Sequence, residues 1–264
     1  MNFAFICLYI LFFVINIAYC TKDQFYHISK EQWEKEYAKG EWNYLDRQAI
    51  ERARAGVIIN MFYDMYGGGA FGPIATTLTS SAGIQSEQHV QHLLDVGCGP
   101  GTLTDYLRGP QRKFYEGIDL STQAIETARK LRADSGSPNS KIHAGIRPLQ
   151  TEQFQQADCM SWMPPLEKDG RPRQYGTIVF NEMLYYVDHK KVLERYQKFL
   201  RPGGIIVISV WFNKEKSLRD TIFSDARKML QSVDEVEFTG VTYTGTKRTK
   251  MPVSFHVEAF RVNA

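Results

Sequence analysis

Residues 93–103 read LLDVGCGPGTL, a short apolar run that leads directly into three glycines at alternate positions. The apolar run predicts a buried strand, and the glycines predict a sharp turn whose backbone can approach a ligand without interference from Cβ atoms. The helix expected after Gly101 would present free N–H groups and a partial positive charge to that ligand. The turn alone does not identify the ligand, because nicotinamide enzymes contain a similar one and a tight turn can exist without any ligand.

From residue 90 onward, short apolar runs alternate with helical stretches. Strands are expected at residues 92–96, 114–118, 175–180 and 204–210, and helices at 102–108, 121–133 and 188–200. Ser121 and Asp188 are good N-cap residues, and Gly203 follows the last helix as a stop signal. The alternation predicts an α/β fold with a parallel sheet covered by helices on both faces. The β-rich segments 233–241 and 253–262 predict a closing antiparallel pair.

The 264 residues allow one large domain or two small ones. Before residue 90, Ile50, Ala53, Val57 and Ile58 share one face of a predicted helix, which a glycine-rich break at 67–73 ends. A loop rich in Ser, Thr and Gly follows at 76–86. This part is too short for a core of its own. We therefore expect residues 21–89 to form an N-terminal helical extension and flexible loop, and residues 90–264 to form a single domain.

Residues 3–19 read FAFICLYILFFVINIAY, with Asn16 as the one polar member. A short apolar stretch at the start of a chain is typical of a signal peptide, and Ala18 and Cys20 are small residues suited to cleavage before Thr21. We expect residues 1–20 to be such a signal and the protein to be in the secretory pathway or secreted. Because no Lys or Arg precedes the stretch, an uncleaved signal anchor is the alternative. It would bind the protein to a membrane with the body in the cytosol.

The overall charge argues against nucleic acid as a partner. Thirty-two Lys and Arg residues against 29 Asp and Glu residues leave a net charge of +3, without the basic excess of a nucleic-acid-binding domain. The pairs of His and Cys residues lack metal-ligand spacing, so no metal site is expected. Cys98 has no activating neighbour in the sequence and is predicted to be a packing residue.

Three details of the glycine turn restrict its ligand. Asp95 precedes the first glycine by two residues, and a carboxylate there suits an ammonium group better than a pyrophosphate. The third glycine comes one residue earlier than in the G-x-G-x-x-G pattern of dinucleotide-binding folds. Asp119 ends the next strand, where a carboxylate can accept hydrogen bonds from both ribose hydroxyls, although NAD enzymes place an acid there too.

Taken together, these segments resemble the class I S-adenosylmethionine-dependent methyltransferases. LLDVGCGPGTL is similar to their first motif, YEGIDLS (115–121) to the acidic end of the second strand, and QADCMSW (156–162) to the turn after the third. YGTIVFNEMLYYV (175–187) and LRPGG (200–204) resemble the fourth strand and the turn before the fifth. WNYLDRQAIERARAGVI (42–58) further resembles the leading helix of a small-molecule subgroup. The resemblance implies a doubly wound, Rossmann-like, mostly parallel seven-stranded sheet with a C-terminal antiparallel strand pair.

The resemblance also implies a cofactor, S-adenosyl-L-methionine, and a set of residues that bind it. These are Asp95, Gly97, Gly99, Gly101, Asp119, Leu120, Asp158, Cys159 and Asn181. The first four would hold the methionine part, the next two would contact the ribose and the adenine, and the 158–159 turn would contact the adenine edge. Asn181 would lie near the sulfonium. A simpler interpretation of Asp158 is that it caps a turn.

The reaction expected is methyl transfer to a hydroxyl or an amine of a small molecule. Glu182 is a candidate to orient or deprotonate the acceptor, and His189 is a candidate base, although it could be a solvated first-turn residue instead. The segment FNEMLYY (180–186) occupies the position where nucleic-acid base methyltransferases have N-P-P-Y, so their motif is missing here. Two alternatives stay open. One is an exported, non-catalytic binding protein that keeps the fold, and the other is a nicotinamide-dependent oxidoreductase.

Overall fold

The computed structural model describes residues 28–40, 42, 48–66, 91–133, 149–212, 217–244 and 249–262. The predicted leader at 1–20, the break at 67–73 and the loop at 76–86 lie outside these ranges, so they stay predictions, as does the division into domains. Within the described ranges, no helix is both long enough and apolar enough to cross a membrane.

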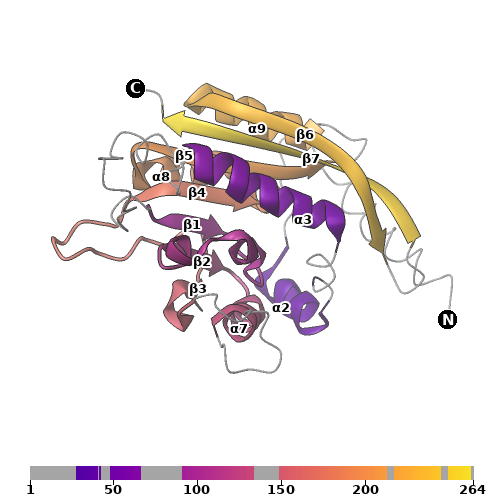
Figure 1. Ribbon diagram of the computed structural model, residues 1–264, viewed down its shortest axis with the longest axis horizontal. Helices are drawn as coiled ribbons and strands as arrows, with labels where there is room; N and C mark the ends of the chain where they lie inside the picture. Colours follow the sequence, from indigo (N-terminus) through magenta and orange to yellow (C-terminus); the bar gives the residue numbers. More distant parts are fainter. Residues whose placement is uncertain are drawn as a thin grey trace.

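Seven strands form one sheet in the order β3-β2-β1-β4-β5-β7-β6. Their bounds are β1 (Leu93–Val96), β2 (Tyr115–Asp119), β3 (Phe154–Gln156), β4 (Tyr175–Asn181), β5 (Leu200–Phe212), β6 (Leu230–Thr244) and β7 (Thr249–Val262). The first five strands pair in parallel, whereas β7 runs antiparallel to both β5 and β6 (Figure 1). The predicted mostly parallel sheet with a closing antiparallel pair is confirmed. The chain order reverses between β1 and β4, the position where open α/β sheets bind ligands.

Both faces of the sheet are buried, which explains why its strands are continuous apolar runs rather than alternating ones. Leu94 of β1 and Ile178 of β4 belong to a core cluster that includes side chains of α8 (His189–Tyr196) and α9 (Ser217–Met229). The neighbouring Leu93 and Val179 point to the other face, where they pack with the helix that begins at Ala49. Successive residues of each strand therefore serve two separate cores.

The remaining helical elements are short. They are α2 (Lys30–Ala38), α3 (Ala49–Gly56), η2 (Val57–Tyr63), α4 (Asp64–Tyr66), η4 (Thr102–Tyr106), α6 (Gly109–Arg112), α7 (Thr122–Ala128), η5 (Arg129–Ala133), η6 (Thr151–Gln153), η7 (Leu184–Tyr186) and η8 (Gln197–Phe199). Both predicted N-caps are confirmed, since the side chain of Ser121 accepts a hydrogen bond from the Ala124 amide and that of Asp188 from the Lys191 amide. The predicted helix at 102–108 is a 3-10 turn, and α9 was not predicted.

The helix at 49–66 buries a face that matches the predicted one in part, because Ile50 and Ile58 are buried and Val57 is half-buried. Ala53 is exposed, whereas Ala55 and Ile58 are buried, together with Ile59, Phe62 and Tyr63. Two charged residues, Glu51 and Arg54, are also buried and form an ion pair of 2.7 Å. Hydrophobic periodicity cannot detect a buried ion pair. The buried apolar residues from Ala55 to Tyr63 keep helical spacing through the π-helical turn of η2, at i, i+3, i+4, i+7 and i+8.

The two alanines of α3 provide a test of this face. We expect Ala53→Lys to change the free energy of unfolding by less than about 0.5 kcal/mol, because its side chain is exposed. Ala55→Lys should lower it by at least about 2 kcal/mol, because Ala55 is 2% exposed and an ammonium would be buried unpaired. Urea unfolding of both variants measures the difference. Equal effects would contradict the helix orientation.

Candidate active site

The glycine turn after β1 adopts a conformation that side chains rarely allow. Gly97, Gly99 and Gly101 have φ angles of 75°, 53° and 76°, all in the left-handed region. A Cβ atom on Gly97 would lie 2.9 Å from the Cβ of Met183, and one on Gly99 would lie 3.0 Å from the Tyr37 hydroxyl. The turn therefore needs glycine both for its backbone angles and for the space around it.

Buried polar contacts hold this turn against β2 and the following helix. The amides of Gly97 and Cys98 both donate to the Ile118 carbonyl, at 2.8 and 2.9 Å. The buried Arg132 guanidinium donates to the Pro100 carbonyl at 3.2 Å. Cys98 is buried as predicted, and this burial raises the pKa of its thiol well above the ordinary value. Cys98 is therefore a packing residue without a reactive thiolate.

Two buried oxygens at the carboxyl ends of adjacent strands have no hydrogen-bond partner among the described residues. One is Oδ1 of Asp95 on β1, and the other is Oδ1 of Asn181 at the end of β4. The second oxygen of Asp95 accepts a hydrogen bond from the Tyr115 hydroxyl at 2.9 Å. Burial raises the pKa of Asp95 to about 7. Because buried polar atoms are rarely left unpaired, these two oxygens point to donors supplied by a ligand.

Asp119 lies where β2 ends, as predicted, with Leu120 half-buried beside it. Its two carboxylate oxygens accept from the amides of Gly99 at 2.9 Å and Ser121 at 2.8 Å, which connect the glycine turn to the start of α7. Burial raises the pKa of this carboxyl to about 6 despite these hydrogen bonds, and the charge of Glu34 adds to the rise. The sheet thus brings the predicted ribose-binding group into direct contact with the glycine turn.

The Asp158–Cys159 turn also lies next to Asp119. The amide of Ala157 donates to the Asp119 carbonyl at 2.8 Å. Asp158 is exposed, and its Oδ1 accepts from the Met160 amide at 2.8 Å, so it caps the turn as the simpler interpretation expected. Cys159 is half-buried, and burial raises the pKa of its thiol to about 12. The placement beside Asp119 suits an adenine-contacting role, which stays a prediction.

Glu182 follows β4 with a φ of 59°, unusual for a residue with a side chain. Its Oε1 accepts from the Ser209 hydroxyl at 2.7 Å, and its Oε2 accepts from the Trp211 amide at 2.7 Å and the Tyr185 hydroxyl at 3.1 Å. Arg54 adds an ion pair at 3.4 Å. These contacts connect the end of β4 to β5 and to α3. They hold the Glu182 side chain in place, and its role in orienting or deprotonating the acceptor stays a prediction.

His189, the other candidate base, begins α8 and is buried rather than solvated. Its Nε2 lies 3.1 Å from an oxygen of Asp225 on α9. Lys190 and Lys228 also pair with Asp225, and these partners lower the pKa of its carboxyl to about 2 even though burial opposes the shift. This contact directs Nε2 toward α9. Catalysis by His189 therefore stays a prediction without a supporting contact.

Sequence reasoning missed α2, which lies against the same site and beside α7 (Figure 1). Glu34 accepts hydrogen bonds at the start of α7, from the amides of Thr122 at 2.7 Å and Gln123 at 3.0 Å and from the Ser121 hydroxyl at 2.9 Å. Tyr37 reaches Gly99, and the pKa of its hydroxyl is raised by burial and further by the Asp119 charge. The i, i+4 spacing of Trp33 and Tyr37 was the signal in the sequence.

Aromatic rings continue from α2 to the segment after β4. The Trp33 ring meets Tyr186 edge-on at 4.9 Å between centroids, and Tyr186 meets Tyr185 at 4.4 Å. We refer to Trp33, Tyr37, Tyr185 and Tyr186 as the aromatic wall. Because Tyr185 and Tyr186 follow β4 closely, the wall lies beside Asn181 and the glycine turn. Such a wall can exclude water and hold a flat or apolar molecule.

Comparison with known proteins gives a family for this chain. The model of a family described as "Methyltransferase domain" matches residues 74–241, more than half of the chain. The chain is 29% identical over 118 residues to the ubiquinone biosynthesis O-methyltransferase of Pasteurella multocida, covering 44% of this chain and 45% of that protein. It is 29% identical over 137 residues to the O-methyltransferase cnsE of Penicillium expansum, covering 52% and 44%. The chain thus spans less than half the length of these relatives.

Among solved structures, the N-methyltransferase NodS of Bradyrhizobium japonicum aligns with 66% of this chain and 88% of its own. The sequence identity is 17% and the TM-score 0.45.

The methyl donor of class I methyltransferases is S-adenosyl-L-methionine, and the residues present fit it. The left-handed glycine turn offers close backbone approach, and Asp95 and Asn181 offer buried oxygens without partners. Asp119 offers a carboxylate at the end of β2, where it could accept from the ribose. These groups match a ligand with an ammonium, a sulfonium and two vicinal hydroxyls.

The contacts of Glu34 lead to a test of how α2 is held. In Glu34→Ala the start of α7 loses a charged acceptor. The free energy that holds α2 against α7 should therefore fall by about 1–2 kcal/mol. We expect backbone amides of residues 30–38 to exchange with solvent about tenfold faster and the affinity for S-adenosylmethionine to fall. Hydrogen exchange and calorimetry measure the two effects. Glu31→Ala, an exposed residue of the same helix, is the control, and unchanged exchange in Glu34→Ala would contradict the assignment.

Proposed function

Because the chain belongs to the methyltransferase domain family of class I, we propose that it transfers the methyl group of S-adenosyl-L-methionine to a hydroxyl or an amine of a small molecule. The observation that carries this proposal is the pair of buried, unpartnered oxygens on Asp95 and Asn181. They lie at the ends of adjacent parallel strands, next to a turn of three left-handed glycines. The same edge of the sheet carries Asp119.

The bound cofactor would supply a methyl group already activated on a sulfonium. The residues of this chain then have to bind it, align the acceptor and exclude water. Asp95, when ionised, attracts the ammonium of the methionine part, and Asp119 accepts from the ribose. Asn181 directs its amide oxygen toward the region where the positively charged sulfonium of the cofactor would lie. The aromatic wall shields this region from solvent and offers flat surfaces to the acceptor.

Between the two acceptor atoms we favour a hydroxyl oxygen. The relatives from Pasteurella multocida and Penicillium expansum are both named O-methyltransferases. A hydroxyl has to lose its proton during transfer. Tyr185, a member of the aromatic wall, lies close to where the substrate that accepts the methyl group would bind. Its hydroxyl donates a hydrogen bond to Glu182 at 3.1 Å. Burial and the Glu182 charge keep the pKa of Tyr185 high, so this tyrosine serves as a wall and a hydrogen-bonding group rather than as a base.

Calorimetry of the full chain with S-adenosylmethionine, S-adenosylhomocysteine and NAD tests the cofactor assignment. We expect binding of the first two and none of NAD. Asp119→Ala should weaken cofactor binding by about 2–4 kcal/mol, because charge-assisted hydrogen bonds to two hydroxyls are lost. Glu126→Gln, an exposed acid on α7, is the control for charge. Wild-type affinity in a folded Asp119→Ala variant would exclude this site, and cofactor binding without transfer to any hydroxyl or amine panel would favour the binding-protein alternative.

The raised pKa of Asp95 predicts how affinity depends on pH. Below its pKa of about 7 the carboxyl is protonated and neutral, so the ammonium of the cofactor loses its partner. Affinity should therefore rise from pH 5.5 to 7, by up to about tenfold per pH unit, and level off above. Asp119, with a pKa of about 6, contributes to the lower part of this range. In Asp95→Asn the rise between pH 6 and 7 should flatten, and a flat wild-type profile measured by calorimetry would contradict the role.

The raised pKa of Asp95 has the opposite effect on the stability of the cofactor-free fold. A carboxyl whose pKa is higher in the folded state stabilises the cofactor-free fold fully below its ordinary pKa of 3.8. This contribution is lost as the pH rises through about 7. Binding and stability thus respond in opposite directions over one pH range, which separates Asp95 from groups that only support the fold.

Glu182→Gln distinguishes positioning from base catalysis. The amide keeps one acceptor oxygen but loses the charge that faces Arg54 and the Trp211 amide. We expect the free energy of unfolding to fall by about 1–3 kcal/mol, with turnover per folded molecule within tenfold of wild type and an unchanged pH profile. A loss of about 10²–10⁴-fold at unchanged stability would instead establish Glu182 as a general base. His189→Ala, measured in parallel, tests the second candidate.

A further inference from the structure

A second group of ionisable side chains lies on β6 and β7, beyond β5 from the glycine turn. The strand register places Glu235 opposite Glu258 and Glu237 opposite His256. Because alternate residues of paired strands share a face, these side chains gather on one side of the sheet. That side is covered by α9, where the Phe223 ring stacks on His256 at 4.0 Å.

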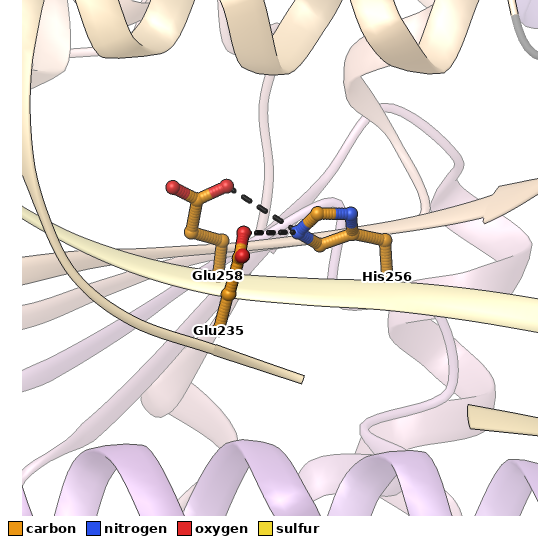
Figure 2. Close-up of side chains that lie close together, drawn as sticks. All are labelled: Glu235, His256 and Glu258. Carbon is orange, nitrogen blue, oxygen red and sulfur yellow. Dashed lines mark ion pairs between the residues drawn. The ribbon is translucent and has the colours of Figure 1, made fainter. Parts of the chain in front are cut away.

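Two carboxylates and one ring nitrogen converge in this group. Figure 2 shows Glu235 and Glu258 both directed toward the same nitrogen of His256, Nε2, at 3.3 Å each. The three ligand atoms lie within 4.8 Å of one another. His256 is 6% exposed, and its Nε2 has no hydrogen-bond partner among the described residues. The nitrogen is thus buried and directed at two anionic oxygens.

The other ring nitrogen explains why this arrangement requires a cation. Nδ1 lies 3.1 Å from Oε1 of Glu237, a carboxylate that can only accept, so Nδ1 carries a hydrogen. In the neutral ring Nε2 then carries a lone pair, and this lone pair faces two more acceptors, the carboxylates of Glu235 and Glu258. Three acceptors at such distances repel one another unless a proton or a metal ion lies between them. A carboxylate that fixes the tautomer of a histidine is one of the usual partners of metal-binding histidines.

The separations suit a tetrahedral ion. Zinc binds nitrogen and carboxylate oxygen at about 2.0–2.2 Å, which places neighbouring ligand atoms about 3.3–3.6 Å apart in a tetrahedron. Both measured distances from Nε2 to the carboxylates, 3.3 Å, match this edge. A cavity of about 290 Å³ is lined by Glu235, His256 and Arg227 but not by Glu258, and it leaves room for water as the fourth ligand.

Arg227 of α9 is the cation that holds these oxygens in the structure. Its Nη2 lies 2.6 Å from Oε2 of Glu235 and 2.7 Å from Oε2 of Glu258. Its side chain is 45% exposed and can turn into solvent, but the Glu258 side chain is 0% exposed, so the incoming ion has to replace the charge that Arg227 provides. Arg219 pairs with Glu237 at 2.7 Å and stays in place. With a divalent ion in place of Arg227, four carboxylates would face one guanidinium and two metal charges, because Arg219 also pairs with Asp220 at 2.6 Å.

We propose that Glu235, His256 and Glu258 form a binding site for a divalent transition-metal ion of the zinc type. Glu237 orients the histidine, and Arg227 is displaced when the ion binds. This inference runs against the absence of a metal site expected from residue spacing. Spacing along the chain could not reveal this site, because the ligands come from two strands and are brought together only by the pairing of β6 with β7.

Zinc titration of the full chain, treated with EDTA and dialysed, tests the proposal by calorimetry. We expect binding of one zinc ion per chain, weakened at least tenfold in Glu235→Gln and in His256→Gln. Glu235 is exposed, so its variant serves if the histidine variant does not fold. Arg227→Gln should bind zinc more tightly, because it removes the competing cation. Glu194→Gln, an exposed acid on α8, should leave zinc binding unchanged.

Cobalt provides a second measurement. Co²⁺ at this site should show the visible absorption of tetrahedral oxygen and nitrogen coordination, lost in Glu235→Gln. A strong near-ultraviolet thiolate band would place the ion on a cysteine and overturn the proposal. Absence of zinc binding, or binding that survives both ligand substitutions, would overturn it as well and would leave a protonated His256 between the two carboxylates.

Discussion

Polar groups meet where parallel strands end, and this constraint shapes the whole candidate site. The carboxyl ends of β1, β2 and β4 lie at one edge of the sheet, so Asp95, Asp119 and Asn181 are brought together from distant parts of the chain. Helices on both faces bury that edge, and burial raises the pKa values of both carboxyl groups. The site thus keeps polar atoms out of water before any ligand arrives, which favours a ligand that can pair with them.

The central sheet was predictable because its physical cause is local. Strands buried on both faces are short apolar runs, and caps such as Ser121 and Asp188 mark helix starts through hydrogen bonds within one turn. The burial of Glu51 and Arg54 on α3 was not predictable, since their ion pair is buried only after β7 supplies Phe255 beneath the guanidinium, 4.5 Å from the ring centre. Periodicity records apolar residues and does not record buried charges.

The residues of the candidate site likewise fall into a predictable and an unpredictable group. Asp119 and the glycine turn follow from motif order, because strand ends and turns determine their positions. The surroundings of Glu182 and His189 do not, because their partners lie on other elements. Ser209 of β5 reaches Glu182, and Asp225 of α9 reaches His189. Residue type indicated suitable chemistry at both positions, but hydrogen bonds between elements separated in sequence determine whether that chemistry is available.

The position of Glu34 makes the N-terminal helix and the candidate cofactor site thermodynamically coupled. Its carboxylate contacts the Ser121 hydroxyl, while the Ser121 amide donates to Asp119, so one residue connects the two groups. If a cofactor on Asp119 favours the docked α2, then docking of α2 favours the cofactor by the same factor. Any covalent tether or binding partner that pulls on α2 would then change cofactor affinity without touching the site, and saturating cofactor would resist that pull.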